Sequence, residues 1–214
     1  MTQTVAVIDY GMGNLHSVAK ALEHAATDTK VRVTSSPTEI RRADRVVLPG
    51  VGALGDCMVG LAELGLDDVV HSLIGQVPLF GVCVGMQILM TFGEENQGVD
   101  TLGVFPGTIT RFPDGSMDPH GERLKIPHMG WNQVWQRPHP IWARIPDGAR
   151  FYFVHSYRLA ETERSDVVGL CDYGTRFAAA VARPGVFAVQ FHPEKSQSAG
   201  LQLYANFLNW DGSC

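Results

Sequence analysis

The chain has 214 residues and a mass of 23.4 kDa, with 45% hydrophobic and 18% charged residues, as expected for a globular protein with a substantial core. Its 17 basic and 22 acidic residues leave a formal net charge of −5, which argues against a nucleic-acid binder. No apolar run approaches the ~20 residues that cross a bilayer, and the first ten residues lack the basic segment of a signal peptide. We therefore expect a cytoplasmic protein with no membrane partner.

The first half of the chain alternates between strand and helix patterns. Short apolar runs predict strands at 5–9, 45–48 and 77–82, and the alternation of polar and apolar residues predicts a strand at 30–34. Helical patterns separate them, at 15–25, from Ser36 onward, at 54–64, at 67–74 and at 84–92. Apolar strands that alternate with helices indicate a mostly parallel sheet with helices on both faces. The sequence thus predicts an α/β fold.

The second half of the chain is rich in glycine, proline and aromatic residues and has little helical periodicity. It predicts short strands at 108–111, 132–135, 149–154, 167–172 and 177–183. We interpret them as a mostly antiparallel extension of the sheet. A strand at 186–191 and a helix at 198–209 then restore the α/β pattern. No repeat or linker divides the chain, so residues 1–214 are predicted to form one domain.

Four cysteines, Cys57, Cys83, Cys171 and Cys214, are widely scattered along the chain. Their spacing fits neither a zinc site nor a disulfide framework, which favours a reducing compartment. Gly11 and Gly13 lack the third glycine of a dinucleotide-binding fingerprint. We therefore predict no metal and no cofactor.

Cys83 lies between the predicted strand 77–82 and the predicted helix that starts near Val84. The small residues Gly81 and Gly85 flank it, as a strained strand-to-helix elbow requires when it exposes a nucleophile. The positive end of the helix dipole also favours a thiolate at this position. The alternative is a buried cysteine at an ordinary tight turn.

His192 is the candidate base, because it directly follows the predicted strand 186–191. The period-two alternation of a strand places Glu194 on the same side, where its carboxylate orients the imidazole. Cys83 and His192 both follow strands of the predicted sheet, and sites in parallel sheets form beyond these carboxyl ends. An exposed turn histidine beside a surface glutamate is the alternative.

Acyl transfer by Cys83 also needs donors for an oxyanion. The turn that contains Gly50 and Val51 follows another buried strand, and the Val84 amide directly follows the nucleophile. A phosphate-binding loop is a weaker interpretation, since no Lys-Ser or Lys-Thr follows this turn. From the residues alone, the chemistry is that of an amide or ester hydrolase with a cysteine nucleophile.

Three separated motifs resemble those of the class I, or triad, glutamine amidotransferases. They are residues 49–52 (PGVG), 81–87 (GVCVGMQ) and 192–194 (HPE), in the order and spacing of that family. Within it, residues 9–15, 127–132 and 152–157 resemble the glutaminase subunits that serve a cyclase in histidine biosynthesis. The resemblance covers nearly the whole chain and implies a flavodoxin-like α/β fold.

The resemblance implies a role for each matched residue. Cys83 attacks the side-chain amide of glutamine, and His192, oriented by Glu194, protonates the departing ammonia. Water then hydrolyses the glutamyl thioester, and Gly50, Val51 and Val84 form the oxyanion hole. The implied substrate-binding residues are Gly52, Gln87, Glu95, Ser156 and Tyr157. Glu94 adjoins Glu95 and is an alternative to it.

The resemblance also implies a partner. It is a (β/α)8-barrel cyclase that receives ammonia through a tunnel and forms imidazole glycerol phosphate and aminoimidazole carboxamide ribonucleotide. The positions that match the contact surface of this heterodimer are Asn14, Trp131, Tyr152 and Lys195. Residues 113–122 form a longer and more polar segment than the family leads us to expect.

Two other hypotheses remain at this point. One is a different triad amidotransferase, such as those of pyridoxal phosphate, aminobenzoate or anthranilate synthesis, which residues 128–132 and 152–157 argue against. The other is an inactive scaffold that only binds its partner. Cys83, His192 and Glu194 argue against it, because a scaffold has no chemical need of them.

Overall fold

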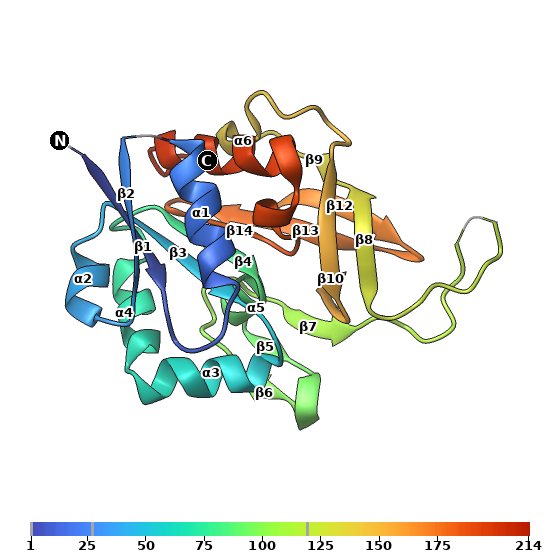
Figure 1. Cartoon of the computed structure of the whole chain (residues 1–214). Coiled ribbons are helices and arrows are strands. Elements are labelled where there is room, and N and C mark those ends of the chain that lie inside the picture. The colour runs from blue at the N-terminus through green and yellow to red at the C-terminus, as the bar shows by residue number, and fades with distance from the viewer. Residues whose placement is uncertain (1, 27, 119) are drawn as a thin grey trace.

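The computed structural model describes residues 2–26, 28–118 and 120–214. Five neighbouring parallel strands form one half of its large sheet (Figure 1). In spatial order they are β2 (Thr29–Thr34), β1 (Gln3–Ile8), β3 (Arg45–Gly50), β4 (Leu79–Cys83) and β14 (Val186–Val189). The predicted parallel sheet is therefore confirmed. Strand β14 comes from the last part of the chain, and it brings the segment after Val189 next to the end of β4.

The sheet continues beyond β14 with strands from the second half of the chain. They are β13 (Thr175–Arg183), β11 (Tyr157–Leu159), β7 (Thr108–Arg111), β5 (Phe92–Gly93) and β6 (Val99–Asp100), while β12 (Val167–Tyr173) pairs with β13 and with β9 (Trp135–Gln136). Among the described residues of this half, only β5 and β7 pair in parallel. The antiparallel extension is thus confirmed apart from the parallel β5–β7 pair, but the strand predicted at 149–154 and the first half of that at 132–135 lie outside it. Strands β8 (His128–Gln133) and β10 (Arg150–His155) pair with each other and form a separate two-stranded sheet.

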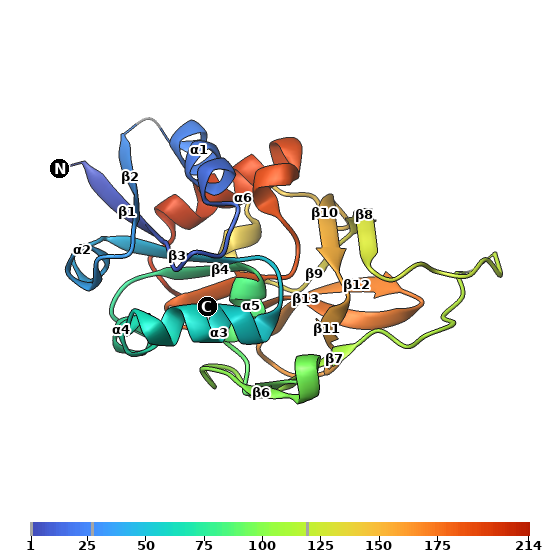
Figure 2. The same ribbon diagram turned by 60° about the horizontal axis from the view of Figure 1, so that its bottom comes forward.

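Helices cover both faces of the large sheet, as predicted. Figure 2 shows α1 (Leu15–Ala25) and α6 (Gln197–Asn209) on one face, and α3 (Leu54–Glu63) and α4 (Leu66–Leu73) on the other. Helix α1 buries Val18, Ala21 and Leu22, which recur at helical spacing on its inner side. The short α2 (Pro37–Arg41) begins where the Ser36 hydroxyl accepts a hydrogen bond from the Glu39 amide.

The helix after Cys83 is shorter than the pattern at 84–92 predicts. Helix α5 (Val84–Ile88) ends because the next carbonyl groups bind a distant loop. The carbonyls of Ile88, Leu89 and Met90 accept hydrogen bonds from the amides of residues 102, 105 and 103. Residues 92–93 then enter the sheet as β5. Tertiary hydrogen bonds have replaced those that would continue the helix.

The core is continuous through both halves of the chain. The parallel strands β3 and β4 are buried at every residue, in keeping with layers on both of their faces. Phe80 lies at the centre of an aromatic cluster, with ring centroids 5.7 Å from Phe187 and 5.1 Å from Phe207. Within the described ranges, no helix is both long and apolar enough to span a membrane.

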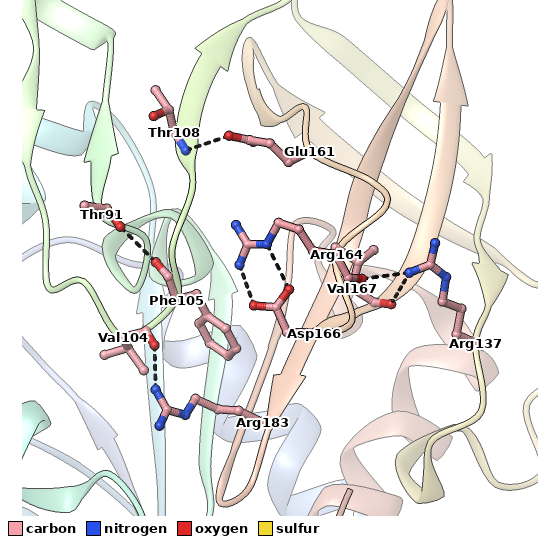
Figure 3. A network of polar contacts seen from close by, with 10 residues as sticks. All are labelled: Thr91, Val104, Phe105, Thr108, Arg137, Glu161, Arg164, Asp166, Val167 and Arg183. Atoms are coloured by element: carbon pink, nitrogen blue, oxygen red, sulfur yellow. Dashed lines mark hydrogen bonds and ion pairs between the residues drawn. The ribbon is translucent and has the colours of Figure 1, made fainter.

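A network of polar contacts ties the loops at one side of the sheet extension together (Figure 3). The Arg183 guanidinium on β13 donates to the Val104 carbonyl at 2.7 Å, and Arg137 donates to the Val167 carbonyl at 3.1 Å. Arg164 pairs with Asp166. The Arg183 contact holds the 101–107 loop, whose amides bind the carbonyls at the end of α5, against β13.

Candidate active site

Cys83 occupies a strained elbow between β4 and α5. Its φ of 55° and ψ of −110° are unusual for a residue with a side chain, and such strain is typical of functional positions. The flanking Gly85 is obligatory, because a Cβ atom there would overlap the carbonyl oxygen of Leu48 on β3. At Gly81, a Cβ would lie 2.9 Å from that of Ala188. The glycines let the elbow pack directly on the neighbouring strands.

His192 and Glu194 form a buried pair beside this elbow. His192 Nδ1 lies 2.9 Å from Glu194 Oε1, and the two side chains are 2% and 0% exposed. Strand alternation is the wrong reason for this contact, because β14 already ends at Val189. Glu194 instead reaches back from the 3₁₀ turn η3 (Pro193–Lys195), which the proline begins. The His192 amide also donates to the Tyr152 carbonyl at 2.9 Å, which anchors the segment to β10.

The electrostatic surroundings of His192 favour its protonated form. Burial alone lowers the pKa of the imidazole, but the charge of Cys83 and the hydrogen bond and charge of Glu194 raise it by more. The net result is a pKa well above the usual value for histidine. Within the described part of the chain, His192 Nε2 is buried without a hydrogen-bond partner. A protonated Nε2 is thus available to a ligand beside Cys83.

A cavity of about 460 Å³ opens at this elbow. Its lining includes ten of the predicted site residues, namely Cys83, His192, Val51, Val84, Gly52, Gln87, Glu95, Ser156, Tyr157 and Lys195. Five predicted residues are not part of the lining: Glu194, Gly50, Asn14, Trp131 and Tyr152. The cavity is large enough for an amino acid and brings together residues from both halves of the chain.

Gly50, which was predicted to form part of the oxyanion hole, does not line the cavity. It is the register partner of Cys83 across β3 and β4. A Cβ at this position would lie 2.7 Å from the Tyr10 hydroxyl and 2.8 Å from the Gly85 amide nitrogen. The next carbonyl, that of Val51, accepts a hydrogen bond from the Cys57 thiol at 3.4 Å. Burial raises the pKa of this thiol, so Cys57 stays a donor that tethers the loop after β3 to α3.

The structure places Glu95, and not Glu94, at the cavity. Glu95 Oε2 accepts a hydrogen bond from the Leu54 amide at the start of α3, at 2.7 Å. Glu94 is exposed and does not line the cavity. Gln87 lines it from α5, one turn after Cys83, as its spacing predicts.

Of the four residues predicted at the partner surface, Lys195 lines the cavity and the other three do not. Trp131 on β8 and Tyr152 on β10 are register partners with ring centroids 6.2 Å apart, and the Lys195 ammonium lies 5.7 Å from the centroid of the Tyr152 ring. Trp131 is 41% exposed. Asn14 is half-buried, and its amide donates to Glu194 Oε1 at 3.5 Å. It therefore contacts the His192–Glu194 pair directly.

Sequence reasoning missed several polar residues at this site. His155 lines the cavity, while Gln190 is completely buried and lies 3.8 Å from the Cys83 sulfur through its amide nitrogen. His128 lies 3.0 Å from His155. One signal was present: Gln190 is a polar residue in the otherwise apolar run 186–191, two positions before His192.

Comparisons with known proteins agree with this geometry. The family model "Glutamine amidotransferase class-I" matches residues 6–210. A solved structure described as a glutamine amidotransferase has a TM-score of 0.71 at 18% identity, covering 96% of this chain and 97% of that one. PurLQS from Thermotoga maritima has a TM-score of 0.73 at 16% identity, covering 98% and 99%. Fold and site define a class I glutamine amidotransferase.

More similar relatives narrow the family further. A protein from Methylococcus capsulatus, "Imidazole glycerol phosphate synthase subunit HisH", is 58% identical over 210 residues, which are 97% of each chain. The protein of that name from Pseudomonas putida is 58% identical over 211 residues, 98% of this chain and 99% of that one. The chain belongs to this family of HisH subunits, and it is therefore an enzyme subunit. Membership of this family excludes the two alternative hypotheses, which were a different triad amidotransferase and an inactive scaffold.

Proposed function

We propose that the chain hydrolyses glutamine to glutamate and ammonia at Cys83, and that the ammonia passes to a cyclase subunit in histidine biosynthesis. One observation carries the proposal. Glu194 holds Nδ1 of the buried His192, while Nε2 has no partner among the described residues and adjoins the cavity that contains Cys83. This is the arrangement that a cysteine nucleophile and its acid–base partner require.

The reaction follows from this geometry. The Cys83 thiolate attacks the side-chain carbonyl carbon of glutamine, and the amides of Val51 and Val84 stabilise the oxyanion. The protonated His192 gives its Nε2 proton to the leaving nitrogen, so that ammonia departs and a glutamyl thioester remains. The neutral imidazole then removes a proton from water, which attacks the thioester and releases glutamate and the thiolate. Glu194 keeps the ring oriented throughout.

The remaining cavity residues are proposed to hold the substrate. All five of them, Gly52, Gln87, Glu95, Ser156 and Tyr157, line the cavity. The carbonyl of Ser156 already accepts the Phe112 amide, and that of Tyr157 accepts two side-chain donors. The Ser156 carbonyl can accept one more hydrogen bond, whereas a glutamine is held by other groups of Tyr157, and Glu95 provides the negative charge for its α-ammonium group.

The proposed partner is a (β/α)8-barrel cyclase that converts ammonia and its nucleotide substrate into imidazole glycerol phosphate and aminoimidazole carboxamide ribonucleotide. Ammonia released into water at neutral pH becomes protonated and ceases to be a nucleophile, so it has to be passed on directly. Trp131, Tyr152, Lys195 and Asn14 are proposed to form the docking surface. We also propose that residues 1–214 act as one domain in the cytoplasm, where the four cysteines stay reduced.

Cys83→Ala tests this function. We expect the variant to lose glutamine hydrolysis by at least about a thousandfold, because Cys83 supplies the only thiol among the described residues that line the cavity. It is expected to retain binding to the cyclase and cyclisation with added ammonium salt, measured as imidazole glycerol phosphate formation. Cys171→Ala, at a buried cysteine in β12 away from the cavity, is the matched control. Glutamine hydrolysis by Cys83→Ala at the wild-type rate would overturn the proposal.

A further inference from the structure

A backbone carbonyl beside the cavity is the meeting point of two side-chain hydrogen bonds. The Tyr157 oxygen lies 2.8 Å from His155 Nδ1 and 3.3 Å from Gln87 Nε2. A carbonyl oxygen can only accept, so both of these nitrogen atoms carry the hydrogen. This single constraint determines the direction of every hydrogen bond that extends from the two side chains.

One arm of the network leads to the nucleophile. Because Gln87 presents its amide nitrogen to Tyr157, the same nitrogen donates its second hydrogen to Gln190 Oε1 at 3.0 Å. Because Gln190 Oε1 faces Gln87, the amide nitrogen of Gln190 faces the other way and lies 3.8 Å from the Cys83 sulfur. The Gln190 side chain is completely buried. An N–H group aimed at sulfur stabilises the thiolate more than the thiol.

The other arm leads away from the cavity to the two-stranded sheet. His155 Nδ1 holds the hydrogen, so His155 Nε2 accepts one from His128 Nδ1 at 3.0 Å. His128 Nε2 then accepts from the Asn132 amide at 3.2 Å, and this amide also donates to the Asp172 carbonyl at 2.9 Å. Burial lowers the pKa of His128 to about 4 and that of His155 to about 3, so both rings are neutral at pH 7.

We propose that Gln190 is a positioning residue whose N–H donates to the Cys83 sulfur, and that His155, through the Tyr157 carbonyl, holds Gln87 and Gln190 in the amide orientation this requires. The inference rests on the proposed role of Cys83 as nucleophile. Without the His155 donor, the Tyr157 carbonyl is no longer held in place and can turn away from Gln87, which then lacks the acceptor that sets the orientation of its amide. Gln190 would then turn its oxygen, an acceptor, toward the sulfur and destabilise the thiolate.

The test measures the reactivity of Cys83 as a function of pH. Iodoacetamide alkylates thiolates, and Cys214 is the exposed cysteine among the four, so all variants carry Cys214→Ser. The titratable groups around the sulfur are His192, Tyr10 and Cys57, which stay unchanged. In Gln190→Met, which keeps the length but has no N–H, we expect the midpoint of the alkylation profile to rise by about one pH unit. In the complex with the cyclase we expect kcat for glutamine to fall about tenfold with KM unchanged.

A pair of variants at position 155 provides a second, independent test. The amide nitrogen of His155→Asn can occupy the place of Nδ1 and donate to the Tyr157 carbonyl, whereas His155→Leu removes the donor. We expect His155→Asn to retain the wild-type alkylation profile and His155→Leu to show the shifted one. This comparison remains decisive if the substitution at the buried Gln190 prevents folding.

The outcomes separate this inference from the proposed function. If the rapidly alkylated site persists in Cys83→Ala, the assignment of the nucleophile itself is wrong. If Cys83→Ala removes that site but Gln190→Met and His155→Leu keep the wild-type midpoint, the positioning role is wrong and the function stands. Equal shifts in His155→Asn and His155→Leu would also overturn it, since they would show that ring packing and not hydrogen-bond donation matters.

Discussion

At the scale of single residues, His192 and His139 differ in the groups that surround their imidazole rings, and therefore in the direction in which their pKa is shifted. His192 adjoins Cys83 and Glu194, and these partners raise its pKa in spite of burial. Burial is what acts on His139, and it lowers the pKa of that imidazole to about 4. Its Nδ1 accepts a hydrogen bond from the Ile141 amide at 3.2 Å, where it begins the 3₁₀ turn η2 (Pro140–Trp142). The environment, and not the residue type, decides which imidazole is charged at pH 7.

His139 predicts a specific pH dependence of stability. Its pKa is about 4 when folded and about 6.5 when unfolded, so the unfolded state binds the proton more tightly. The free energy of unfolding therefore falls as the pH is lowered from 6.5 toward 4, by up to about 1.4 kcal/mol per pH unit for this residue. His139→Asn keeps an acceptor for Ile141 but cannot titrate, and it should flatten the dependence.

Urea unfolding between about pH 7.5 and pH 4.5 measures this effect, since that range spans most of the interval between the two pKa values. His16→Asn is the control, since His16 is exposed on α1, and its slope should equal that of the wild type. An identical slope for His139→Asn and the wild type would contradict the prediction.

At the scale of elements, two helices approach the proposed catalytic residues through a glycine each. Gly85 lets α5 pack on the Leu48 carbonyl of β3, directly after Cys83. Gly200 lets α6 pack on the Pro193 carbonyl of η3, the turn that carries Glu194. A Cβ atom at either position would overlap backbone oxygen, which cannot move out of the way as a side chain can. Close helix packing thus fixes Cys83 and Glu194, two of the three members of the proposed triad.

Gly85→Ala is expected to destabilise the fold by roughly 1–3 kcal/mol, because α5 has to move away from β3. The same movement displaces Cys83, so glutaminase activity should fall further than the loss of folded protein explains. Gly55→Ala on α3 is the matched control, since no atom of the described residues lies within 4 Å of its added Cβ. Alanine there should leave stability unchanged or raise it by up to about 1 kcal/mol. Equal unfolding midpoints and activities for the two variants would refute this view.

At the scale of the whole molecule, the cavity lies at the end of the parallel strands and opens beside the two-stranded sheet. The exposed Trp131 and Met129 of β8 lie on that small sheet. The polar segment 113–122, described except for residue 119, precedes β8 and extends away from the body of the protein (Figure 1). Two residues of the proposed docking surface, Trp131 and Tyr152, therefore belong to an element outside the main sheet, whereas Lys195 and Asn14 lie beside the His192–Glu194 pair.

Trp131→Ala should weaken binding to the cyclase by about 2 kcal/mol or more, because large aromatic side chains dominate interface energies. Trp135→Ala is the control: Trp135 is also 41% exposed, but it lies on β9 in the large sheet and packs at Gly148. Affinity is measured by titration calorimetry with the cyclase. An equal loss of affinity for the cyclase in Trp131→Ala and Trp135→Ala would argue against the proposed docking surface.

A second prediction at this scale concerns activation. We expect low glutaminase activity from the isolated chain and a strong rise when the cyclase and its nucleotide substrate are present. The physical reason is that an oxyanion donor at Gly50–Val51 has to be aligned, and the Cys57 thiol tethers the Val51 carbonyl. Steady-state glutamate release with and without partner measures this, and full activity of the isolated chain would contradict it.

Local sequence patterns were sufficient to predict much of the fold and part of the candidate site. The apolar runs predicted the parallel strands, and the glycines around Cys83 predicted its elbow, because both depend on neighbouring residues and on backbone sterics. The helix at 84–92 was predicted too long, since the amides that end it come from residues 102–105. The contact between His192 and Glu194 was expected for a reason that does not hold.

The sequence by itself determined the fold class, the elbow and the family, since each is encoded in short segments or in motifs in a set order. Tertiary structure alone decided that Glu95 and not Glu94 reaches the cavity, that Gln190 faces Cys83, and that His155 meets the Tyr157 carbonyl. These contacts join residues far apart in the chain. Their geometry depends on how strands and loops pack in three dimensions, and no local preference of the backbone encodes it.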